Sequence, residues 1–438
     1  MKCGFFKKDI TPPIGQYMSG KAMPRIAQGV EDPLYVRALA FEEEKRAIVM
    51  VFDFAGMRQE LCQRIRCYVA QKMGLDQGDI LIACTHTHTG PVLCGDMDPA
   101  DADYVAALPT YALAAAQGAV ADLKEAAMLG AQDVLEKVTY IRRFRMKDGT
   151  VRTNPGRNNP DVLEPMSPAD ETIRLVRFVR EGAEEILLVN FQVHPDVMNT
   201  TGYSADYPGV VCKTLEQALP GTHCIYFNGT AGDLNHIDIH TPAWDPNVGP
   251  AQALHMGRSI AGKALMLYTK ARPLAAGAVR TIQKPVTIHL RAPEPERVPE
   301  SREIVRLHEA GLDDQLPYTG MELVTAYFEA RQIIERSQPG YQTEKTVTVS
   351  GLSVGDLCVV GIPGEPFCEI GRRIREDSPF AMQLTLGICN GYEGYFPTAD
   401  AFEVNGYESR TSRFVPGIGE AMMEAGRAVT ASLRKNEI

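Results

Sequence analysis

The chain has 438 residues, 45% hydrophobic and 23% charged, which is the composition of a globular protein with a substantial core. Its formal net charge is −10 and its lysines and arginines are scattered, which excludes nucleic acid as the main partner. There is no signal-peptide pattern, no apolar run of membrane-spanning length, and no Cys-x-x-Cys pair among the ten cysteines. These features predict a soluble, cytoplasmic protein with reduced thiols and no stable membrane association.

Strand-like and helix-like patterns alternate through the first part of the chain. Residues 34–41 and 47–52 are apolar, β-branched segments joined by a charged turn, which predicts a hairpin. A helical spacing of apolar residues follows at 58–72, and an alanine-rich helix is expected at 104–123. Between them, the apolar run 80–84 is too short for a helix and is typical of a buried strand.

The second part continues the alternation and sets the fold class. The expected elements are a hairpin at 172–179 and 185–193, strands at 224–228, 345–352 and 357–362, and helices at 248–269 and 421–433. Hairpins mixed with strand–helix units favour an α/β fold with mixed β-sheets and flanking helices over a purely parallel doubly wound fold. We expect one domain over residues 1–438, in which the Pro- and charge-rich, then helical, stretch 292–342 is an insertion or lid.

Two of the nine histidines directly follow the predicted strand at 80–84. His86 and His88 stand in the sequence Thr-His-Thr-His-Thr-Gly-Pro, and residues two apart in an extended segment point to the same side. Loops at strand ends hold catalytic groups, and neutral imidazole is the commonest metal ligand. The motif therefore predicts a metal or catalytic site rather than a polar cap on a strand. His194 repeats this design at the end of the strand predicted at 185–193.

A rival histidine pair lies further along the chain. His236 and His240 are four residues apart, with Asp233 and Asp238 nearby, and would share one face of a helix. The flanking glycine and asparagine disfavour such a helix, so this pair is the alternative ligand set. The four remaining histidines are expected to be structural or at the surface: His223, His255, His289 and His308.

Several segments, taken in order, resemble the catalytic domain of the neutral/alkaline, non-lysosomal ceramidase family. The matching segments are residues 9–15, 85–91, 191–194, 362–367, 391–395 and 406–408. The His-x-His-Thr-Gly-Pro element is the most specific of them, and the likeness runs from residue 9 to about residue 410. The chain departs from the family at Asn235, where true ceramidases are expected to have serine, and it has no room for the additional C-terminal β-domain.

This resemblance implies a set of metal ligands and a set of substrate-facing residues. One zinc ion (Zn²⁺) per chain is expected, held by His86, His194, Glu365 and Tyr395. Since a phenol must lose its proton to bind a metal well, a hydrogen-bonding or stacking role is the alternative for Tyr395. The residues expected to face the substrate are His88, Tyr407 and Arg142 as reacting or oxyanion-binding groups, with Asn228, Asp233, Asn235 and Arg143 as substrate-binding groups. Arg143 is also the alternative to Arg142.

The function implied is hydrolysis of an amide by a zinc-bound hydroxide. Since no amphipathic membrane-binding helix is evident, a small, soluble N-acyl substrate is expected rather than ceramide. The alternatives are an ester or lactone hydrolase with the same centre, and a non-catalytic metal- or ligand-binding protein. A serine hydrolase is disfavoured because the Gly-x-Ser-x-Gly match around Ser353 joins two predicted strands instead of a strand and a helix.

Overall fold

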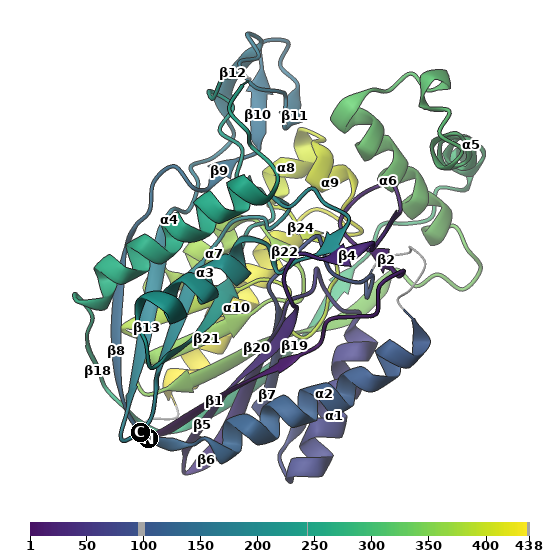
Figure 1. Cartoon of the computed structure of the whole chain (residues 1–438). Coiled ribbons are helices and arrows are strands. Elements are labelled where there is room, and N and C mark those ends of the chain that lie inside the picture. Colours follow the sequence, from purple (N-terminus) through teal and green to yellow (C-terminus); the bar gives the residue numbers. More distant parts are fainter. Residues whose placement is uncertain (95–100, 243, 436–438) are drawn as a thin grey trace.

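A computed structural model describes residues 1–94, 101–242 and 244–435, and its two largest β-sheets are stacked face to face (Figure 1). The larger sheet has the order β16-β14-β13-β8-β1-β5-β6-β7, with β18 also paired to β8. Only the β6–β7 and β14–β16 pairs in it are parallel. Its strands are β1 (Lys2–Asp9), β5 (Tyr35–Glu43), β6 (Lys45–Phe52), β7 (Ile80–Cys84), β8 (Lys124–Val134), β13 (Thr172–Arg180), β14 (Glu185–Phe191), β16 (Thr222–Asn228) and β18 (Arg272–Leu274).

The smaller sheet has the order β19-β20-β21-β23, formed by Val279–His289, Glu344–Val354, Leu357–Gly361 and Met382–Leu386. Its inner face joins that of the larger sheet in one apolar core, where Leu39 and Leu188 of the larger sheet lie with Leu352 and Leu384 of the smaller. Alternating apolar side chains on facing strands bury this shared layer. Both sheets mix parallel and antiparallel pairs, which confirms the predicted fold class.

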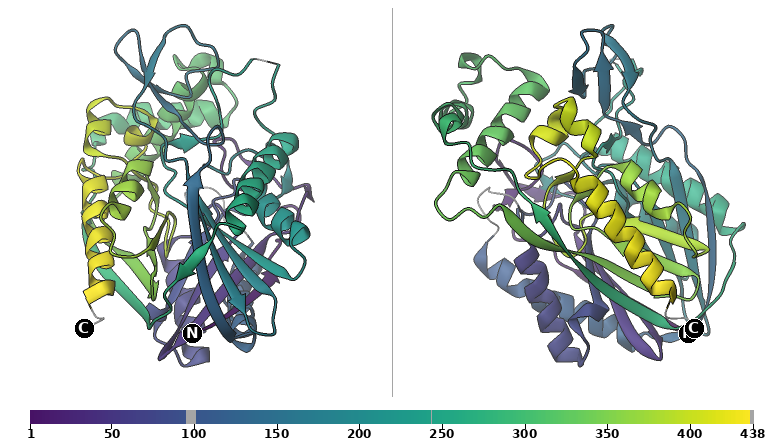
Figure 2. Two further views of the ribbon diagram at one scale, coloured as in Figure 1. Left: turned by 90° about the vertical axis from the view of Figure 1, so that its left-hand side faces the viewer. Right: turned by 180° about the vertical axis from the view of Figure 1, so that it is seen from behind.

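Helices cover both outer faces of the sandwich (Figure 2). Helices α1 (Gln59–Met73) and α2 (Ala102–Ala121) pack on the β1, β5, β6 and β7 part of the larger sheet. Helices α3 (Asp206–Ala218) and α4 (Pro250–Tyr268) pack on β13, β14 and β16. On the other side, α7 (Cys368–Arg375) and α10 (Ile418–Lys435) pack on the smaller sheet.

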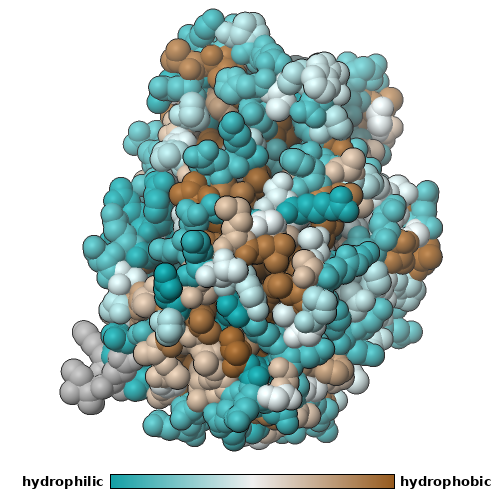
Figure 3. All heavy atoms as spheres, turned by 60° about the vertical axis from the view of Figure 1, so that its left-hand side comes forward, coloured by the Kyte–Doolittle hydropathy of each residue, from teal (hydrophilic) through white to brown (hydrophobic). Residues whose placement is uncertain are grey.

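Helix α2 is the one described helix that is long and apolar enough to cross a membrane by length and composition alone. Its residues Leu108, Ala112, Ala115 and Ala119 are fully buried against the larger sheet and α1, a contact that the core helix of a globular protein makes equally well. The face of the molecule in Figure 3 is largely hydrophilic, with apolar side chains in small groups.

The stretch 292–342 contains two helices that pack on each other, α5 (Val298–Glu309) and α6 (Gly320–Arg336). Helix α6 also contacts α9 (Tyr407–Arg410), where Arg410 bonds to Glu329 at 2.6 Å. The remaining short elements are β2 (Tyr17–Met18), β3 (Arg25–Ile26), β4 (Gly29–Val30), β9 (Tyr140–Ile141), β10 (Arg143–Met146), β11 (Val151–Thr153), β12 (Val162–Pro165), β15 (Gly202–Tyr203), β17 (Leu234–Asn235), β22 (Glu365–Pro366), β24 (Tyr395–Phe396), α8 (Ala399–Glu403) and the 3₁₀ turns Gln77–Asp79, Pro295–Arg297 and Asp313–Gln315.

The predicted hairpins, buried strands and long helices all form at the expected positions, within a few residues at their ends. Ser353 lies inside β20 and pairs with Cys358 of β21, so no strand-to-helix turn exposes it as a nucleophile. The sequence patterns did not reveal β1, β8 or α3, and these three elements complete the larger sheet and its helical cover.

Candidate metal centre

The predicted histidines are delivered to one place by the ends of two parallel-paired strands. After β7, the amides of Thr85 and His86 donate to the carbonyls of Phe52 and Phe54, which extends the pairing with the β6 segment. His86 has φ of 73°, a left-handed conformation that a histidine rarely adopts and that the surrounding hydrogen bonds must hold. His194 lies three residues past the end of β14. The ends of β7 and β14 therefore position the side chains of His86 and His194 close together.

Each of the three histidines is oriented by a hydrogen bond from Nδ1 to a backbone carbonyl. The acceptors are Ala55 O for His86 at 2.5 Å, Gly20 O for His88 at 3.0 Å and Ala231 O for His194 at 3.3 Å. A carbonyl can only accept, so Nδ1 carries the proton and Nε2 of each ring carries a lone pair.

These three Nε2 atoms converge. His86 Nε2 lies 3.0 Å from His194 Nε2 and 3.2 Å from His88 Nε2, and the three ligand nitrogens are all within 4.8 Å of one another. Lone pairs that face each other at this distance repel unless a cation or proton lies between them. Backbone carbonyls behind metal-bound histidines are the usual means of fixing their orientation. The group therefore fits a metal ion.

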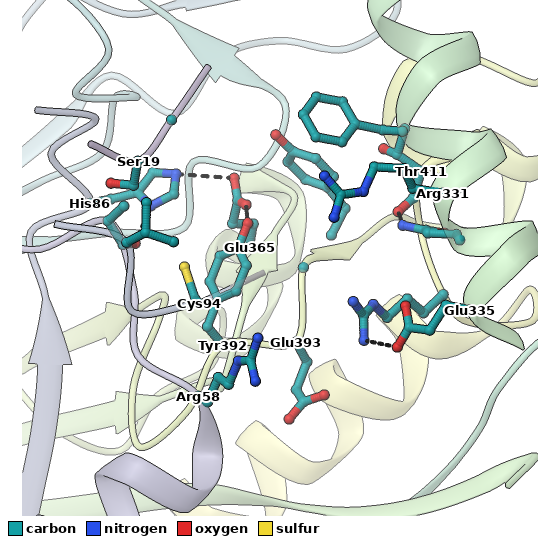
Figure 4. A pocket seen from close by; sticks show the side chains of 18 of the residues that line it. Ser19, Arg58, His86, Cys94, Arg331, Glu335, Glu365, Tyr392, Glu393 and Thr411 are labelled. Carbon is teal, nitrogen blue, oxygen red and sulfur yellow. Dashed lines mark hydrogen bonds and ion pairs between the residues drawn. The ribbon is translucent and has the colours of Figure 1, made fainter. Parts of the chain in front are cut away.

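Glu365 in β22 adds a carboxylate to the same point (Figure 4). Its Oε2 lies 3.3 Å from His86 Nε2 and 3.6 Å from His194 Nε2, and it is buried without a hydrogen-bond partner. Its Oε1 accepts a hydrogen bond from the Tyr392 hydroxyl at 2.6 Å. Burial favours the neutral acid, but the adjacent His86 and His194 outweigh it and hold the pKa of Glu365 well below its usual value. An ionised, buried oxygen without a donor is the second observation that fits a cation.

The protonation of two of the three histidines, His88 and His194, agrees with this arrangement. Burial and the neighbouring His86 lower the pKa of His194 to about 3, and burial with both neighbours holds the pKa of His88 well below its usual value. Burial also disfavours charge on His86, but Glu365 outweighs it and raises the pKa of that ring. His88 and His194 are thus neutral near pH 7, the form that binds a metal.

Tyr395, Tyr407 and Arg142 form a second group in the same region. The Tyr395 and Tyr407 rings are 5.6 Å apart, and the Arg142 guanidinium lies 5.2 Å and 5.8 Å from their centroids. Arg142 is buried and fixed by hydrogen bonds to Glu408 at 2.7 Å and to Gly232 O at 2.6 Å. Both tyrosines line the cavity together with His86, His88 and Glu365.

The structure separates Arg142 from Arg143. The Arg143 guanidinium packs 4.8 Å from the Phe367 ring centroid and lies 3.7 Å from Glu408. Neither arginine lines the cavity itself, but Arg142 contacts the rings of Tyr395 and Tyr407, which do line it. Asp233 accepts from the backbone amide of Cys368 at 2.7 Å, where it caps α7. Asn235 bonds to Asn154 and to the amide of Ile237. The contacts of Arg143, Asp233 and Asn235 are therefore structural, and these three expected substrate-binding residues do not line the cavity.

Asn228 does lie beside the histidines. Its Nδ2 donates to Thr85 O at 3.2 Å, and it lines a small space with His86, His194 and Glu365. The rival ligand pair is not formed: residues 234–242 contain no helix, His236 is buried 3.1 Å from Asp196, and His240 is exposed. Within the described ranges, His86, His88 and His194 are the one group of three or more His, Cys, Asp or Glu residues placed to share a metal.

Sequence reasoning missed Tyr392, whose hydroxyl orients Glu365. The signal was present, since Tyr392 and Tyr395 stand three residues apart in the segment 391–395. It also missed α6 as a wall of the cavity, to which α6 contributes Phe328, Arg331, Gln332 and Glu335. The cavity has a volume of about 400 Å³.

Comparison with known proteins places the fold. No family model matches the chain. The crystal structure of the neutral ceramidase from Pseudomonas aeruginosa superposes with a TM-score of 0.75 at 18% sequence identity, over 99% of this chain and 74% of that chain. A ceramidase complexed with C2 gives a TM-score of 0.75 at 17% identity, over 99% and 75%.

The chain therefore has a ceramidase-like fold that carries a candidate metal centre. More particularly, the fold is that of the neutral ceramidases, as the resemblance in the sequence predicted.

Proposed function

We propose that the chain is a zinc-dependent hydrolase that cleaves the amide bond of a small, polar N-acyl substrate. The observation that carries this proposal is the convergence of His86, His88, His194 and Glu365, of which His86, His88 and Glu365 line one cavity. The neutral ceramidase fold supports the choice of reaction, because a ceramidase acts on an amide.

Zinc is favoured by the spacing of the donor atoms. Zinc–nitrogen and zinc–oxygen bonds of about 2.0–2.1 Å in a tetrahedron separate neighbouring ligand atoms by about 3.3 Å. The observed separations are 3.0 Å between His86 and His194, 3.3 Å between His86 and Glu365, and 3.6 Å between His194 and Glu365. We assign these three residues to the ion, with Tyr395 proposed as the fourth ligand.

The residues around the proposed zinc site have distinct proposed roles. A bound zinc ion supplies an acidified water molecule and polarises the scissile carbonyl. His88 lines the cavity and has its Nδ1 proton committed to Gly20 O, so its Nε2 is free to accept a proton. Arg142 is held rigidly by Glu408 and Gly232, and with the Tyr407 hydroxyl it can stabilise the developing oxyanion.

The lining of the cavity supports a small polar substrate over a lipid. A long acyl chain needs a mainly apolar groove. Instead, the described lining carries many charged side chains, among them Lys21, Arg58, Arg331, Lys345, Arg413, Glu60, Glu335 and Glu393. Two ion pairs, Lys345–Glu393 at 2.6 Å and Arg413–Glu335 at 3.1 Å, stand in its wall. If a ceramide tail packed against these charged groups, the groups would lose their hydrating water and gain no hydrogen bonds in its place.

The test compares an amide and an ester of the same acyl group, p-nitroacetanilide and p-nitrophenyl acetate, with zinc supplied. We expect a larger rate enhancement over the uncatalysed reaction for the amide. His88→Gln is expected to lower kcat about 100-fold with metal content unchanged, whereas His255→Gln, an exposed histidine of α4, serves as the control. A larger enhancement for the ester favours the esterase or lactonase alternative. Zinc binding without turnover of any amide or ester favours a binding protein.

A further inference from the structure

A second cavity of about 630 Å³ lies between the start of β13 and the C-terminal end of α7. Its charged lining residues are Asp170, Arg174, Arg372, Arg373, Arg375, Glu376 and Asp377. None of them lines the cavity of the candidate metal centre, so this cavity is independent of the proposed hydrolase activity.

Arg174 is a buried arginine without a carboxylate partner. It is 6% exposed, and its one hydrogen bond runs from Nη1 to Thr172 O at 3.3 Å. The buried Arg37 and Arg142, by contrast, each bond to a carboxylate at 2.7 Å. Burial, and then repulsion by Arg375, lower the pKa of the Arg174 guanidinium to about 9. A buried charge is costly unless a counter-charge pairs with it.

The nearby carboxylate, Asp170, is already used. It bonds to Arg375 and accepts from the amide of Thr172 at 3.1 Å. Arg375 is itself buried, and its Nη1 has no hydrogen-bond partner. Arg174 and Arg375 therefore have one nearby carboxylate between them, and Arg375 repels the Arg174 guanidinium.

The charged residues at the mouth of the cavity do not supply the carboxylate that Arg174 lacks. Glu376 lies 3.2 Å from Arg373 and 3.5 Å from Arg427, which leaves it paired at the surface. Asp377 is exposed, and Arg372 is half-buried on the same helix as Arg375. Arg174 thus has no carboxylate acceptor, and Nη1 of Arg375 has no hydrogen-bond acceptor at all.

We propose that this cavity binds a compact oxyanion, a phosphate or a carboxylate, between Arg174 and Arg375, with Arg372 at its mouth. The planar guanidinium matches two oxygens of either group and forms short, charge-assisted hydrogen bonds to them. Such an anion supplies the counter-charge that Arg174 lacks and an acceptor for the unbonded Nη1 of Arg375.

The test titrates the protein with inorganic phosphate and, separately, with acetate, at constant ionic strength set by sodium chloride, and follows heat of binding and Tm. We expect saturable binding and a higher Tm with at least one of the two ions. Binding of phosphate alone identifies a phosphate site, and binding of both identifies a general oxyanion site. Arg174→Met should weaken binding at least about tenfold, the loss expected for a charge-assisted hydrogen bond, and Arg174→Lys should weaken it less.

The control is Arg302→Met, at an exposed arginine of α5, which should bind as the unchanged protein does. Without added anion, Arg174→Met should be at least as stable as the unchanged protein, because it removes an uncompensated buried charge. The proposal is overturned if neither ion binds saturably, or if Arg174→Met binds as well as the control. It is also overturned if Arg174→Met is destabilised in anion-free buffer, since Arg174 would then be a structural residue.

Discussion

The two carboxylate oxygens of Glu365 have different surroundings, and the difference defines a role for Tyr392. Oε1 accepts from the Tyr392 hydroxyl, while Oε2 faces His86 and His194. The hydrogen bond fixes the rotation of the carboxylate, so Oε2 stays directed at the histidines.

Tyr392→Phe is therefore expected to lower zinc affinity about 10- to 100-fold without unfolding the protein. Competition with a chromogenic chelator measures the affinity, and circular dichroism checks the fold. Tyr68→Phe on α1, away from the centre, is the matched control and should bind zinc normally. Equal zinc affinity in Tyr392→Phe and the unchanged chain would show that the hydrogen bond does not position Glu365.

Asp206, a second buried carboxyl, makes stability depend on pH. It accepts hydrogen bonds from the amides of Val197, Met198 and Tyr207, yet burial raises its pKa to about 6. The folded chain then holds the proton more tightly than the unfolded chain, so the free energy of unfolding falls as pH rises from about 4 to about 6, by about 3 kcal/mol from this group.

Asp206→Asn keeps a side chain that tolerates the positive φ of 57° at this position and removes the titration. Urea unfolding between pH 4 and 7 should show a smaller loss of stability with rising pH for this variant than for the unchanged chain. Parallel curves for the two proteins would refute the raised pKa.

At the residue scale, the sequence predicted the convergence of the histidines and Glu365 better than it predicted the contacts of the other candidate residues. His86, His88, His194 and Glu365 stand in local motifs that fix their place at a strand end or turn, and the structure brings them together. Arg143 and Asp233 stand in equally suggestive motifs but turn to Phe367 and to the amide of Cys368. Which neighbour a side chain meets across the fold is not encoded in its own segment.

At the scale of elements, α7 must pack closely against the loop that contains Thr230. A Cβ added to Gly371 would lie 2.1 Å from Thr230 Oγ1, in the loop that follows β16. Gly262 in α4 has no heavy atom within 4 Å of the corresponding position. Substitution by alanine can therefore be compared at a crowded helical position, Gly371, and at an open one, Gly262.

Gly371→Ala is expected to destabilise the protein by about 1–3 kcal/mol through overpacking, whereas Gly262→Ala should stabilise it by about 0.5–1 kcal/mol through helix propensity. Chemical unfolding of both variants measures the difference. A stable Gly371→Ala protein would mean that α7 and the Thr230 loop are not in close contact.

Long-range pairing explains the elements that the sequence did not reveal. Strand β1 alternates weakly and carries three lysines among its eight residues, yet it lies between β5 and β8 inside the larger sheet. Helix α3 begins Asp-Tyr-Pro, and Pro208 signals a break unless it falls in the first turn, where its missing N–H costs nothing. Tertiary contacts decide such segments.

At the scale of the whole molecule, the sandwich gathers donors from distant parts of the chain. His86 follows β7, His194 follows β14 and Glu365 lies in β22, which pairs with β24, so the site exists only when the larger sheet and the β22–β24 pair are assembled. The overall class could be predicted because local hairpin and helix patterns accumulate into a recognisable order. The packing of α6 against the cavity depends on contacts with α9 that local patterns do not contain.

The central claim is that these residues form one zinc site, and metal content by elemental analysis tests it most directly. The purified chain and a His86→Ala/His194→Ala double variant are compared after incubation with zinc and removal of the excess, with His223→Ala/His289→Ala as the control pair from the surface. We predict about one zinc per chain in the unchanged and control proteins and none in the double variant. No zinc in the unchanged protein, or equal zinc in the double variant, would contradict the account.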